Sequence, residues 1–209
     1  MAKKLIVWVG PTSSAKSSGA IGMAHRIRGQ GKSIILIRPK RSMRNYEDDG
    51  MFLTKDGAVW PSFDVDHPHE IEDIVAKVKP FAVWIDEPAL FVEETTTGLP
   101  PWLFETVVAL REKCMILVSG ISSTSELEVF GKSFPLILAV ADEIIQCRGD
   151  CPWCGRFNVA TRSMYLGSEE KLSPDLVGGA DVYQPACDTC WNEIIKSPAA
   201  KRRGLMKQD

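Results

Sequence analysis

Long hydrophobic stretches and an excess of basic residues are both missing from this sequence. No uninterrupted apolar run approaches the ~20 residues that span a bilayer, and Met1-Ala2-Lys3-Lys4 leads directly into a short apolar segment. We therefore expect no transmembrane helix, no secretory signal and no membrane partner. The 25 Lys+Arg and 27 Asp+Glu residues give a net charge of −2. Because such a chain lacks a general basic field, we expect no direct nucleic-acid partner.

The rest of the composition is that of an ordinary globular protein. Hydrophobic residues make up 44% of the 209 residues and charged residues 25%, which excludes intrinsic disorder, collagen and coiled coils. Six cysteines in a chain without an expected signal favour thiols or metal ligands over disulfides. We expect a soluble, cytoplasmic α/β protein of one or two domains.

Apolar runs that alternate with helical patterns predict a mostly parallel sheet. A strand, a loop, a helix and a second strand open the chain, which implies a parallel pair with a right-handed crossover. Residues 39–70 are expected to be irregular, with a short hairpin near Gly57. We expect buried strands at residues 4–9, 33–37, 81–85 and 115–118, an extended segment at 143–146, and helices at 16–28, 69–78, 103–113 and 136–141.

A candidate phosphate loop follows the first strand and precedes the first helix. It matches the pattern G-x-x-x-x-G-K-[ST], except that Ala15 replaces the second glycine. Its backbone N–H groups would bind phosphate oxygens, Lys16 would reach the β and γ phosphates, and Ser17 would ligate Mg²⁺. The alternative is a serine-rich turn with an exposed lysine. The loop comprises Gly10, Pro11, Thr12, Ser13, Ser14, Ala15, Lys16, Ser17 and the adjoining Ser18.

The methyl group of Ala15 matters because a glycine usually occupies this position. It is harmless if the φ angle is negative and costly if φ must be positive. The sequence leaves both cases open.

A pair of acids, Asp86-Glu87, ends the third apolar strand. Residues at the carboxyl ends of parallel strands face the ligand crevice, so Asp86 would bind Mg²⁺ through water. Glu87 would take a proton from an attacking hydroxyl. The alternative is an acid that serves solvation or helix capping.

Two C-x-x-C pairs, separated by 32 residues, predict a metal site. Four thiolates in two such pairs suit tetrahedral Zn²⁺, and a fully ligated zinc is structural. The alternative is a set of coincidental thiols or a redox pair. Cys147 and Cys114 are expected to be buried thiols. The four proposed ligands are Cys151, Cys154, Cys187 and Cys190.

The chain changes character at Cys147, where cysteines and glycines replace long apolar runs. Such a composition is typical of a small metal-stapled module. We therefore expect a phosphate-loop nucleotide-binding α/β domain over residues 1–146, a zinc-binding module over 147–195 and a flexible tail over 196–209. Within the module, Val177, Gly178, Gly179 and Tyr183 belong to a stretch whose paired glycines would fold tightly around a ligand or form an ordinary turn.

These motifs occur in the order found in the type II (cytosolic-type) thymidine kinases, which the chain resembles over residues 4–195. The family has a phosphate loop, a D-E pair, a four-cysteine zinc site and a lasso loop carrying V-G-G-x-x-x-Y. Phe130-Gly131 resembles its P-F-G segment, and Ala141-Asp142-Glu143 its A-D-E segment. The resemblance implies a RecA-like core with a zinc-bearing lasso domain, assembled as a homotetramer or homodimer.

The resemblance also implies ATP-dependent phosphorylation of a deoxynucleoside 5′-hydroxyl, with ATP, Mg²⁺ and structural Zn²⁺ as cofactors. Glu87 would be the general base, and the main chain around Val177–Tyr183 would close over the nucleoside. Thr161 stands where the family has a threonine that contacts the base. Leu90 and Phe130 fall in segments that match the family's nucleoside pocket, and Arg44 retains the arginine of its D-x-R-Y element beside the phosphates.

The departures from the family lie around the nucleoside. D-E-G-Q-F-F becomes Asp86-Glu87-Pro88-Ala89-Leu90-Phe91, and the L-D-x-x-F-[RQ] segment becomes 121–126, which ends in Ser125-Glu126. Thr12, Ser13 and Ala160 stand where the family has larger residues. Aromatic contacts to a flat base contribute about 0.5–1.5 kcal/mol each beyond their area, so their loss weakens thymidine binding unless the pocket is rebuilt.

Two functions of different classes compete. The first is a thymidine kinase-like deoxynucleoside kinase whose pocket suits a base larger or more polar than thymine. The second is a catalytically lapsed relative that binds nucleotide and acts as a binding or regulatory module. A zinc-ribbon nucleic-acid binder is a weaker third hypothesis, because the net charge of −2 counts against it.

Overall fold

The computed structural model describes residues 2–42, 50–53, 57–91, 101–121, 123–166 and 182–195. The chain forms two compact units. The first comprises residues 1–9, 16–120 and 131–145, and the second comprises 10–15, 121–130 and 146–209. The expected division at residues 1–146, 147–195 and 196–209 stays a prediction. Among the described residues, no helix has the length and apolar character needed to cross a membrane.

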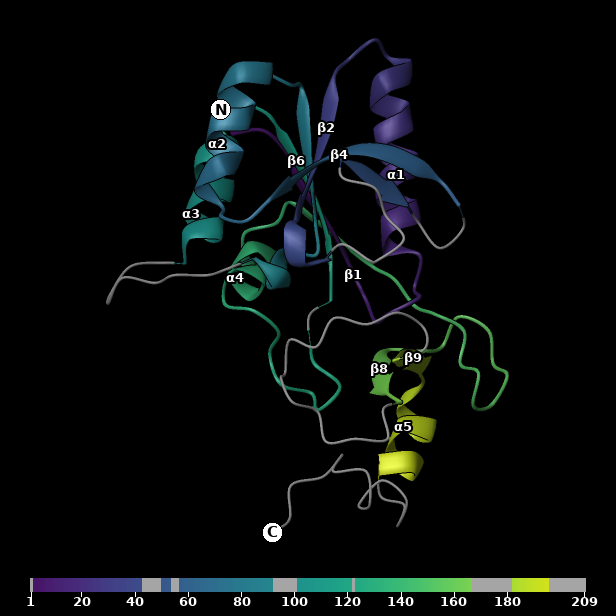
Figure 1. Ribbon diagram of the computed structural model, residues 1–209. Helices are drawn as coiled ribbons and strands as arrows, with labels where there is room; N and C mark the ends of the chain where they lie inside the picture. Colours follow the sequence, from purple (N-terminus) through teal and green to yellow (C-terminus); the bar gives the residue numbers. More distant parts are fainter. Residues whose placement is uncertain are drawn as a thin grey trace. The chain divides into compact units, whose positions relative to one another are not determined.

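A seven-stranded sheet with the order β3-β4-β2-β5-β6-β1-β7 organises the first unit (Figure 1). Pairs β1–β6, β5–β6, β2–β5 and β2–β4 are parallel, which confirms the expected α/β class with a mostly parallel sheet. The strands are β1 (Leu5–Val9), β2 (Ile34–Pro39), β3 (Met51–Leu53), β4 (Val59–Val65), β5 (Ala82–Asp86), β6 (Met115–Gly120) and β7 (Glu143–Gln146).

Helices cover both faces of this sheet. Helix α1 (Lys16–Gly29) lies on one face, and α2 (His69–Val78) and α3 (Trp102–Leu110) lie on the other (Figure 1). Helix α4 (Ser133–Ala139) packs against α3 and begins three residues before the helix expected at 136–141. The short 3₁₀ segments η1 (Lys40–Ser42) and η2 (Pro88–Leu90) follow β2 and β5.

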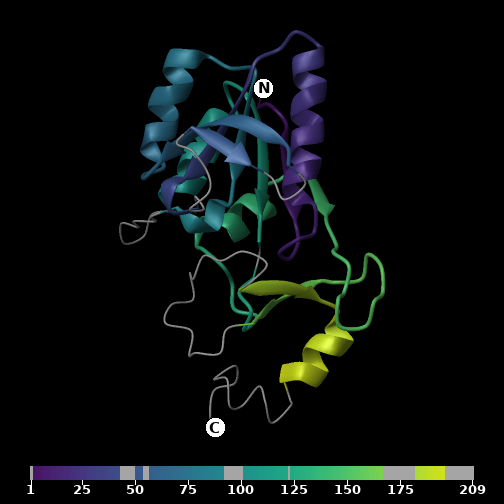
Figure 2. The ribbon, with the colours of Figure 1, turned by 45° about the vertical axis from the view of Figure 1, so that its right-hand side comes forward.

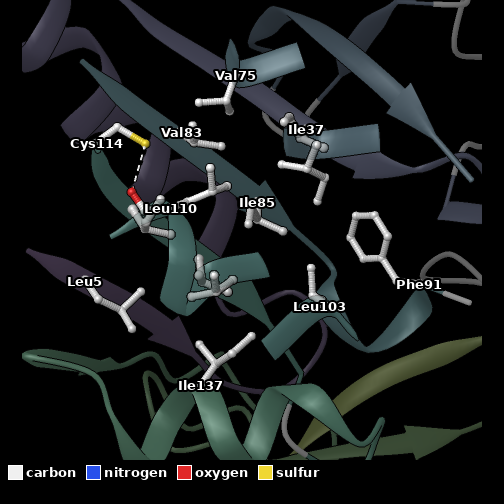
Figure 3. Packing of buried hydrophobic residues seen from close by; sticks show 14 of the residues in the cluster. Leu5, Ile37, Val75, Val83, Ile85, Phe91, Leu103, Leu110, Cys114 and Ile137 are labelled. Atoms are coloured by element: carbon white, nitrogen blue, oxygen red, sulfur yellow. Dashed lines mark hydrogen bonds between the residues drawn. The ribbon is translucent and has the colours of Figure 1, made fainter. Parts of the chain in front are cut away.

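Alternate residues of the central strands build two apolar layers, because successive side chains of a strand point to opposite faces. Val83 and Ile85 of β5 belong to the layer that includes α2, α3 and α4 (Figure 3). Trp84, between them, belongs to the other face and is fully buried. Cys114 belongs to the first layer, and its thiol donates to the Leu110 carbonyl over 3.6 Å. Burial raises the pKa of this thiol to about 11. Cys114 is therefore a buried thiol, as expected, whereas Cys147 is half-buried.

The second unit contains a two-stranded antiparallel ribbon and one helix. Strand β8 (Arg162–Tyr165) pairs with β9 (Tyr183–Ala186), which leads into helix α5 (Asp188–Ile195) (Figure 2). Because β9 ends immediately before Cys187, the ribbon delivers two of the proposed metal ligands to the start of α5.

Strand β4 corrects the expectation that residues 39–70 are irregular apart from a hairpin. Strands β3 and β4 do form an antiparallel pair on either side of Gly57, but β4 also pairs in parallel with β2. The strand escapes a search for apolar runs because two of its inward positions, Ser62 and Asp64, are polar.

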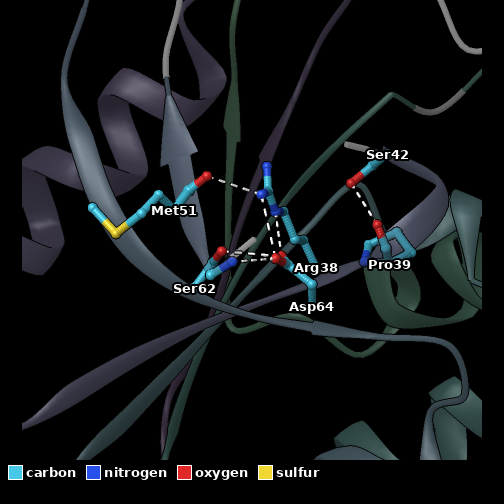
Figure 4. Close-up of polar contacts among 7 residues, drawn as sticks. Arg38, Pro39, Ser42, Met51, Ser62 and Asp64 are labelled. Atoms are coloured by element: carbon cyan, nitrogen blue, oxygen red, sulfur yellow. Dashed lines mark hydrogen bonds and ion pairs between the residues drawn. The ribbon is translucent and has the colours of Figure 1, made fainter. Parts of the chain in front are cut away.

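Those polar side chains surround Arg38, which is buried at the end of β2 (Figure 4). Its Nε atom lies 2.5 Å from Asp64 Oδ1, and its Nη2 donates to the Met51 carbonyl over 3.0 Å. The Gly50 amide and the Ser62 hydroxyl donate to the same carboxylate over 2.9 and 3.0 Å. Burial raises the pKa of Asp64, but the Arg38 hydrogen bond and the Gly50 and Ser62 donors outweigh it, so the pKa lies below its ordinary 3.8.

Replacing Asp64 with asparagine should destabilise the protein by about 3–5 kcal/mol at neutral pH, because Arg38 stays buried but loses the charge of the carboxylate that contacts its Nε. The stabilisation by the carboxylate is fully present above pH 3.8 and is lost as the pH falls through the lower folded pKa. The difference between the free energies of unfolding of the two proteins, measured in urea, should therefore narrow as the pH falls below 3.8. A difference in free energy of unfolding that does not change with pH would contradict this account. Asp66→Asn, in the exposed pair with Lys40, is the control and should change stability by less than about 1 kcal/mol.

Candidate functional site

The candidate phosphate loop joins β1 to α1, as the sequence predicts. Ser13 and Ala15 have positive φ angles of 55° and 58°, and Ser14 between them does not. The Ser14 hydroxyl donates to the Pro11 carbonyl over 2.8 Å, which closes the turn. Alternating backbone handedness of this kind points successive N–H groups into one concavity and suits an anion.

Gly10 is required at the start of the loop. A Cβ atom there would lie 2.3 Å from the Cys147 carbonyl oxygen and 2.7 Å from Ser14 Oγ. The amide of Thr12, two residues later, donates to Ser163 Oγ of β8 over 3.0 Å. No sequence signal marks Ser163, because the contact joins residues 151 positions apart.

The structure shows that the φ angle of Ala15 is positive. Its φ of 58° lies in the left-handed region, where a Cβ atom costs about 1–2 kcal/mol. The loop therefore keeps the backbone that a glycine would adopt, at the expense of strain in the free protein.

Lys16 and the acid pair lie together in the first unit. Lys16 is the first residue of α1 and is only 6% exposed, which rules out the exposed lysine of the alternative hypothesis. Asp86 is the last residue of β5 and is 4% exposed, and Glu87 follows it with a φ of 46°. Ser17 and Ser18 are half-buried in the first turn of α1.

The carboxyl group of Asp86 sits in an unusual electrostatic environment. Burial and the neighbouring Glu87 raise its pKa to about 7, whereas a hydrogen bond from Ser119 and the charges of Lys16 and Arg38 oppose this shift. The buried Asp86 next to the half-buried Glu87 is most stable with a cation beside it, because a bound cation reverses the effect of burial on the carboxyl pKa. The carboxylate of Asp86 and the hydroxyl of Ser17 are oxygen donors of the kind that Mg²⁺ takes, so these residues fit the metal.

The four predicted cysteine ligands converge in the second unit. Their Sγ atoms all lie within 4.8 Å of one another, and those of Cys154 and Cys187 are 3.9 Å apart. Tetrahedral Zn–S bonds of about 2.3 Å imply sulfur separations of about 3.8 Å. The amides of Cys187 and Cys190 point at Cys151 and Cys187 Sγ over 3.4 and 3.5 Å. The cluster is thus positioned to bind a metal ion.

Arg156 contacts two of these sulfurs and was missed in the sequence. Its Nε donates to Cys154 Sγ and its Nη2 to Cys187 Sγ, each over 3.2 Å. The hydrogen bond from Arg156 is the main cause that lowers the pKa of Cys154 to about 6. The guanidinium would therefore compensate part of the negative charge that four thiolates would gather around a divalent metal. Its position two residues after a C-x-x-C pair was the available signal.

The predicted nucleoside contacts are divided between the two units. Leu90 is buried in η2 of the first unit, and Phe130 is half-buried in the second. The Thr161 hydroxyl donates to Asp188 Oδ1 over 2.8 Å, and the Tyr183 ring lies 5.6 Å from that of Tyr165. Their convergence on one nucleoside stays a prediction. Four predicted residues lie outside the described part of the chain: Arg44, Val177, Gly178 and Gly179.

A loop with the phosphate-binding pattern between a strand and a helix, together with an acid pair at the end of another parallel strand, is typical of α/β proteins of the phosphate-loop class. Comparison with known proteins narrows the class. The family model described as "Thymidine kinase" matches residues 3–191. The chain belongs to the thymidine kinase family, which confirms the resemblance found in the sequence, and it is a thymidine kinase-like nucleoside kinase.

Individual relatives are distant. A thymidine kinase of Choristoneura biennis entomopoxvirus is 27% identical over 88% of this chain and 94% of its own length. Thymidine kinases of Mesomycoplasma hyopneumoniae (strain 7448) and Coprothermobacter proteolyticus are 25% and 28% identical over 88% of this chain and over 92% and 88% of their own lengths. Identities this low leave the preferred base open.

Replacing Ala15 with glycine should stabilise the free protein by about 1 kcal/mol, because it relieves the left-handed strain. The matched control is Ala76→Gly at an exposed position of α2, which should destabilise by about 1 kcal/mol because helical glycine loses more entropy. Thermal unfolding of the two variants measures both effects. Equal destabilisation by both substitutions would show that residue 15 is not strained.

Replacing Arg156 with alanine should speed metal loss from the zinc-loaded protein about tenfold, the lower bound for partners of metal ligands. The rate is measured by transfer of zinc to a chromogenic chelator. Arg162→Ala is the control, because Arg162 pairs with Asp188 over 2.7 Å and the structure gives it no contact to sulfur. Identical release rates in the two variants would contradict a role for Arg156 at the cluster.

Proposed function

We propose that the protein transfers the γ-phosphate of ATP to the 5′-hydroxyl of a deoxynucleoside. The observation that carries this proposal is the buried Lys16 ammonium beside the Asp86 carboxylate, at the start of a helix that follows a phosphate-type loop. Membership of the thymidine kinase family supports the nucleoside as acceptor.

Each residue has a distinct role in this reaction. The loop amides and Lys16 bind the phosphate oxygens of ATP. Ser17, and Asp86 through water, would hold a Mg²⁺ ion, which would supply neutralisation of the phosphate charge. Glu87 accepts the proton of the 5′-hydroxyl while the 5′-oxygen of the nucleoside forms a bond to the γ-phosphorus. The bond from that phosphorus to the β,γ-bridging oxygen breaks, and ADP leaves. Positioning and charge neutralisation supply most of the catalysis, because phosphoryl transfer has a loose transition state.

The nucleoside pocket is proposed to accept a base larger or more polar than thymine. Ser13 is exposed and Ser125 is buried with its hydroxyl on Glu126, so both offer polar groups where relatives carry bulk. Ala160 adds no room, because it is fully buried among Cys151, Cys187 and Cys190. Thr161, Leu90, Phe130 and Tyr183 are the proposed nucleoside contacts.

Three further properties belong to the same proposal. The four cysteines bind one structural Zn²⁺, whose thiolate donor set they supply. The chain assembles as a homotetramer or homodimer and works in the cytoplasm. Assembly is tested by light scattering of the purified protein, where a monomer would contradict it.

Incubation with Mg·ATP and a panel of natural and modified deoxynucleosides tests the reaction. Glu87→Gln should lower kcat about 10²–10⁴-fold, the usual contribution of a general base, and should retain the rise in melting temperature that nucleotide causes. Lys16→Ala should lose the activity and also the rise in melting temperature that nucleotide causes. Glu143→Gln, in an exposed pair with Lys4, is the control and should behave as the wild type.

The alternative, a lapsed nucleotide-binding relative, gives a different result. Nucleotide would still raise the melting temperature, but no nucleoside in the panel would be phosphorylated. The strained φ of Ala15 is the observation that favours this alternative.

A further inference from the structure

Ser119, the second-last residue of β6, contacts both members of the acid pair. Its hydroxyl donates to Asp86 Oδ1, and its carbonyl oxygen accepts the Glu87 amide over 2.8 Å. The same hydroxyl accepts the indole N–H of Trp84 over 2.7 Å. Trp84 and Ser119 are fully buried, and Asp86 is 4% exposed. None of these contacts has a role in the reaction described above.

The sheet register produces this cluster. In the parallel pair of β5 and β6, Asp86 lies opposite Ser119. Trp84 and Asp86 are two residues apart on β5, so their side chains leave the same face of the sheet. Ser119 is on that face too, because Val118 beside it belongs to the opposite apolar layer.

The indole of Trp84 determines which way the hydroxyl proton points. An indole nitrogen is only a donor, whereas a serine hydroxyl has one proton and can accept as well. Once Trp84 donates to Ser119 Oγ, the hydroxyl proton is directed to Asp86. The carboxylate is then fixed through Oδ1, and its plane and its second oxygen are fixed with it.

The backbone of β6 also fixes Glu87. This residue has a φ of 46°, a conformation that non-glycine residues avoid, and its amide is bound by the Ser119 carbonyl. The next residue, Pro88, fits only because residue 120 is glycine, since a Cβ there would lie 2.7 Å from Pro88 Cδ. The end of β6 therefore places both acids.

We propose that Ser119 and Trp84 are positioning residues that orient Asp86 toward a divalent cation–nucleotide complex. The inference rests on the proposed function, in which Asp86 belongs to the Mg²⁺ site. A carboxylate that is preorganised in this way binds the cation without losing rotational freedom at that moment, and partners of metal ligands commonly have this effect.

Binding of Mn²⁺ in the presence of ATP, followed by electron paramagnetic resonance, tests the inference without relying on turnover. Ser119→Ala should weaken Mn·ATP binding about 10–100-fold, the usual effect of losing the partner of a metal ligand. Trp84→Phe should weaken it less, because the Ser119 hydroxyl remains but can rotate. In both variants kcat should fall, while the KM for the nucleoside stays close to that of the wild type.

Ser62→Ala is the matched control. It removes another buried serine-to-aspartate hydrogen bond of the same sheet, to Asp64, and should lower the melting temperature while leaving Mn·ATP binding unchanged. If Ser119→Ala does not fold, Trp84→Phe alone carries the comparison with Ser62→Ala.

Asp86→Asn separates failure of the inference from failure of the proposed function. If it abolishes Mn·ATP binding while Ser119→Ala and Trp84→Phe bind as the wild type does, the positioning role is wrong and the function stands. If the wild type takes up no Mn²⁺ with ATP and phosphorylates no nucleoside, both are wrong. If Asp86→Asn binds Mn·ATP normally, Asp86 does not belong to the cation site and the inference is wrong, whereas phosphorylation by the wild type decides the function.

Discussion

The parallel pairing of β5 with β6 is the constraint on which the candidate site depends. It sets Asp86 opposite Ser119, and one residue of slippage would turn every side chain of one strand to the other face. Fully buried apolar side chains on both faces of the two strands make this register costly to change. The core packing that stabilises the fold therefore also fixes the geometry of the acid pair. This explains how a conformation as unfavourable as that of Glu87 persists at the strand end.

Two buried carboxylates at the same edge of the sheet are compensated to different degrees. Asp64 has a guanidinium, an amide and a hydroxyl around it, so its pKa is lowered and its charge is satisfied within the protein. Asp86 accepts a hydrogen bond from Ser119, and the charges of Lys16 and Arg38 favour its ionised form, but burial beside Glu87 still leaves its pKa raised. The first arrangement is a structural ion pair. A bound cation would stabilise the second further, which is the property expected of a binding group rather than a structural one.

The sequence could predict the features that depend on long apolar runs or on fixed spacing. Strands β1, β2, β5 and β6, the loop after β1 and the four cysteines fall into this class. Strand β4 could not be predicted, because its burial depends on Arg38, which lies 26 positions before Asp64. The Trp84–Ser119 and Thr12–Ser163 contacts join residues 35 and 151 positions apart. They depend on how the strands pair, which the sequence alone does not specify. The φ angle of Ala15 could be negative or positive, and only the folded backbone decides its sign.

The cysteine cluster has a consequence for the phosphate loop within the second unit. Cys187 directly follows β9, β9 pairs with β8, and Ser163 of β8 accepts the Thr12 amide. The Cys147 carbonyl oxygen of the same unit also restricts the loop, because it leaves no space for a side chain at residue 10. Metal binding contributes folding free energy to a small module that lacks a large apolar core. A metal ion bound by the four cysteines would therefore also stabilise the backbone of Gly10–Ala15, although no cysteine of the cluster belongs to the loop.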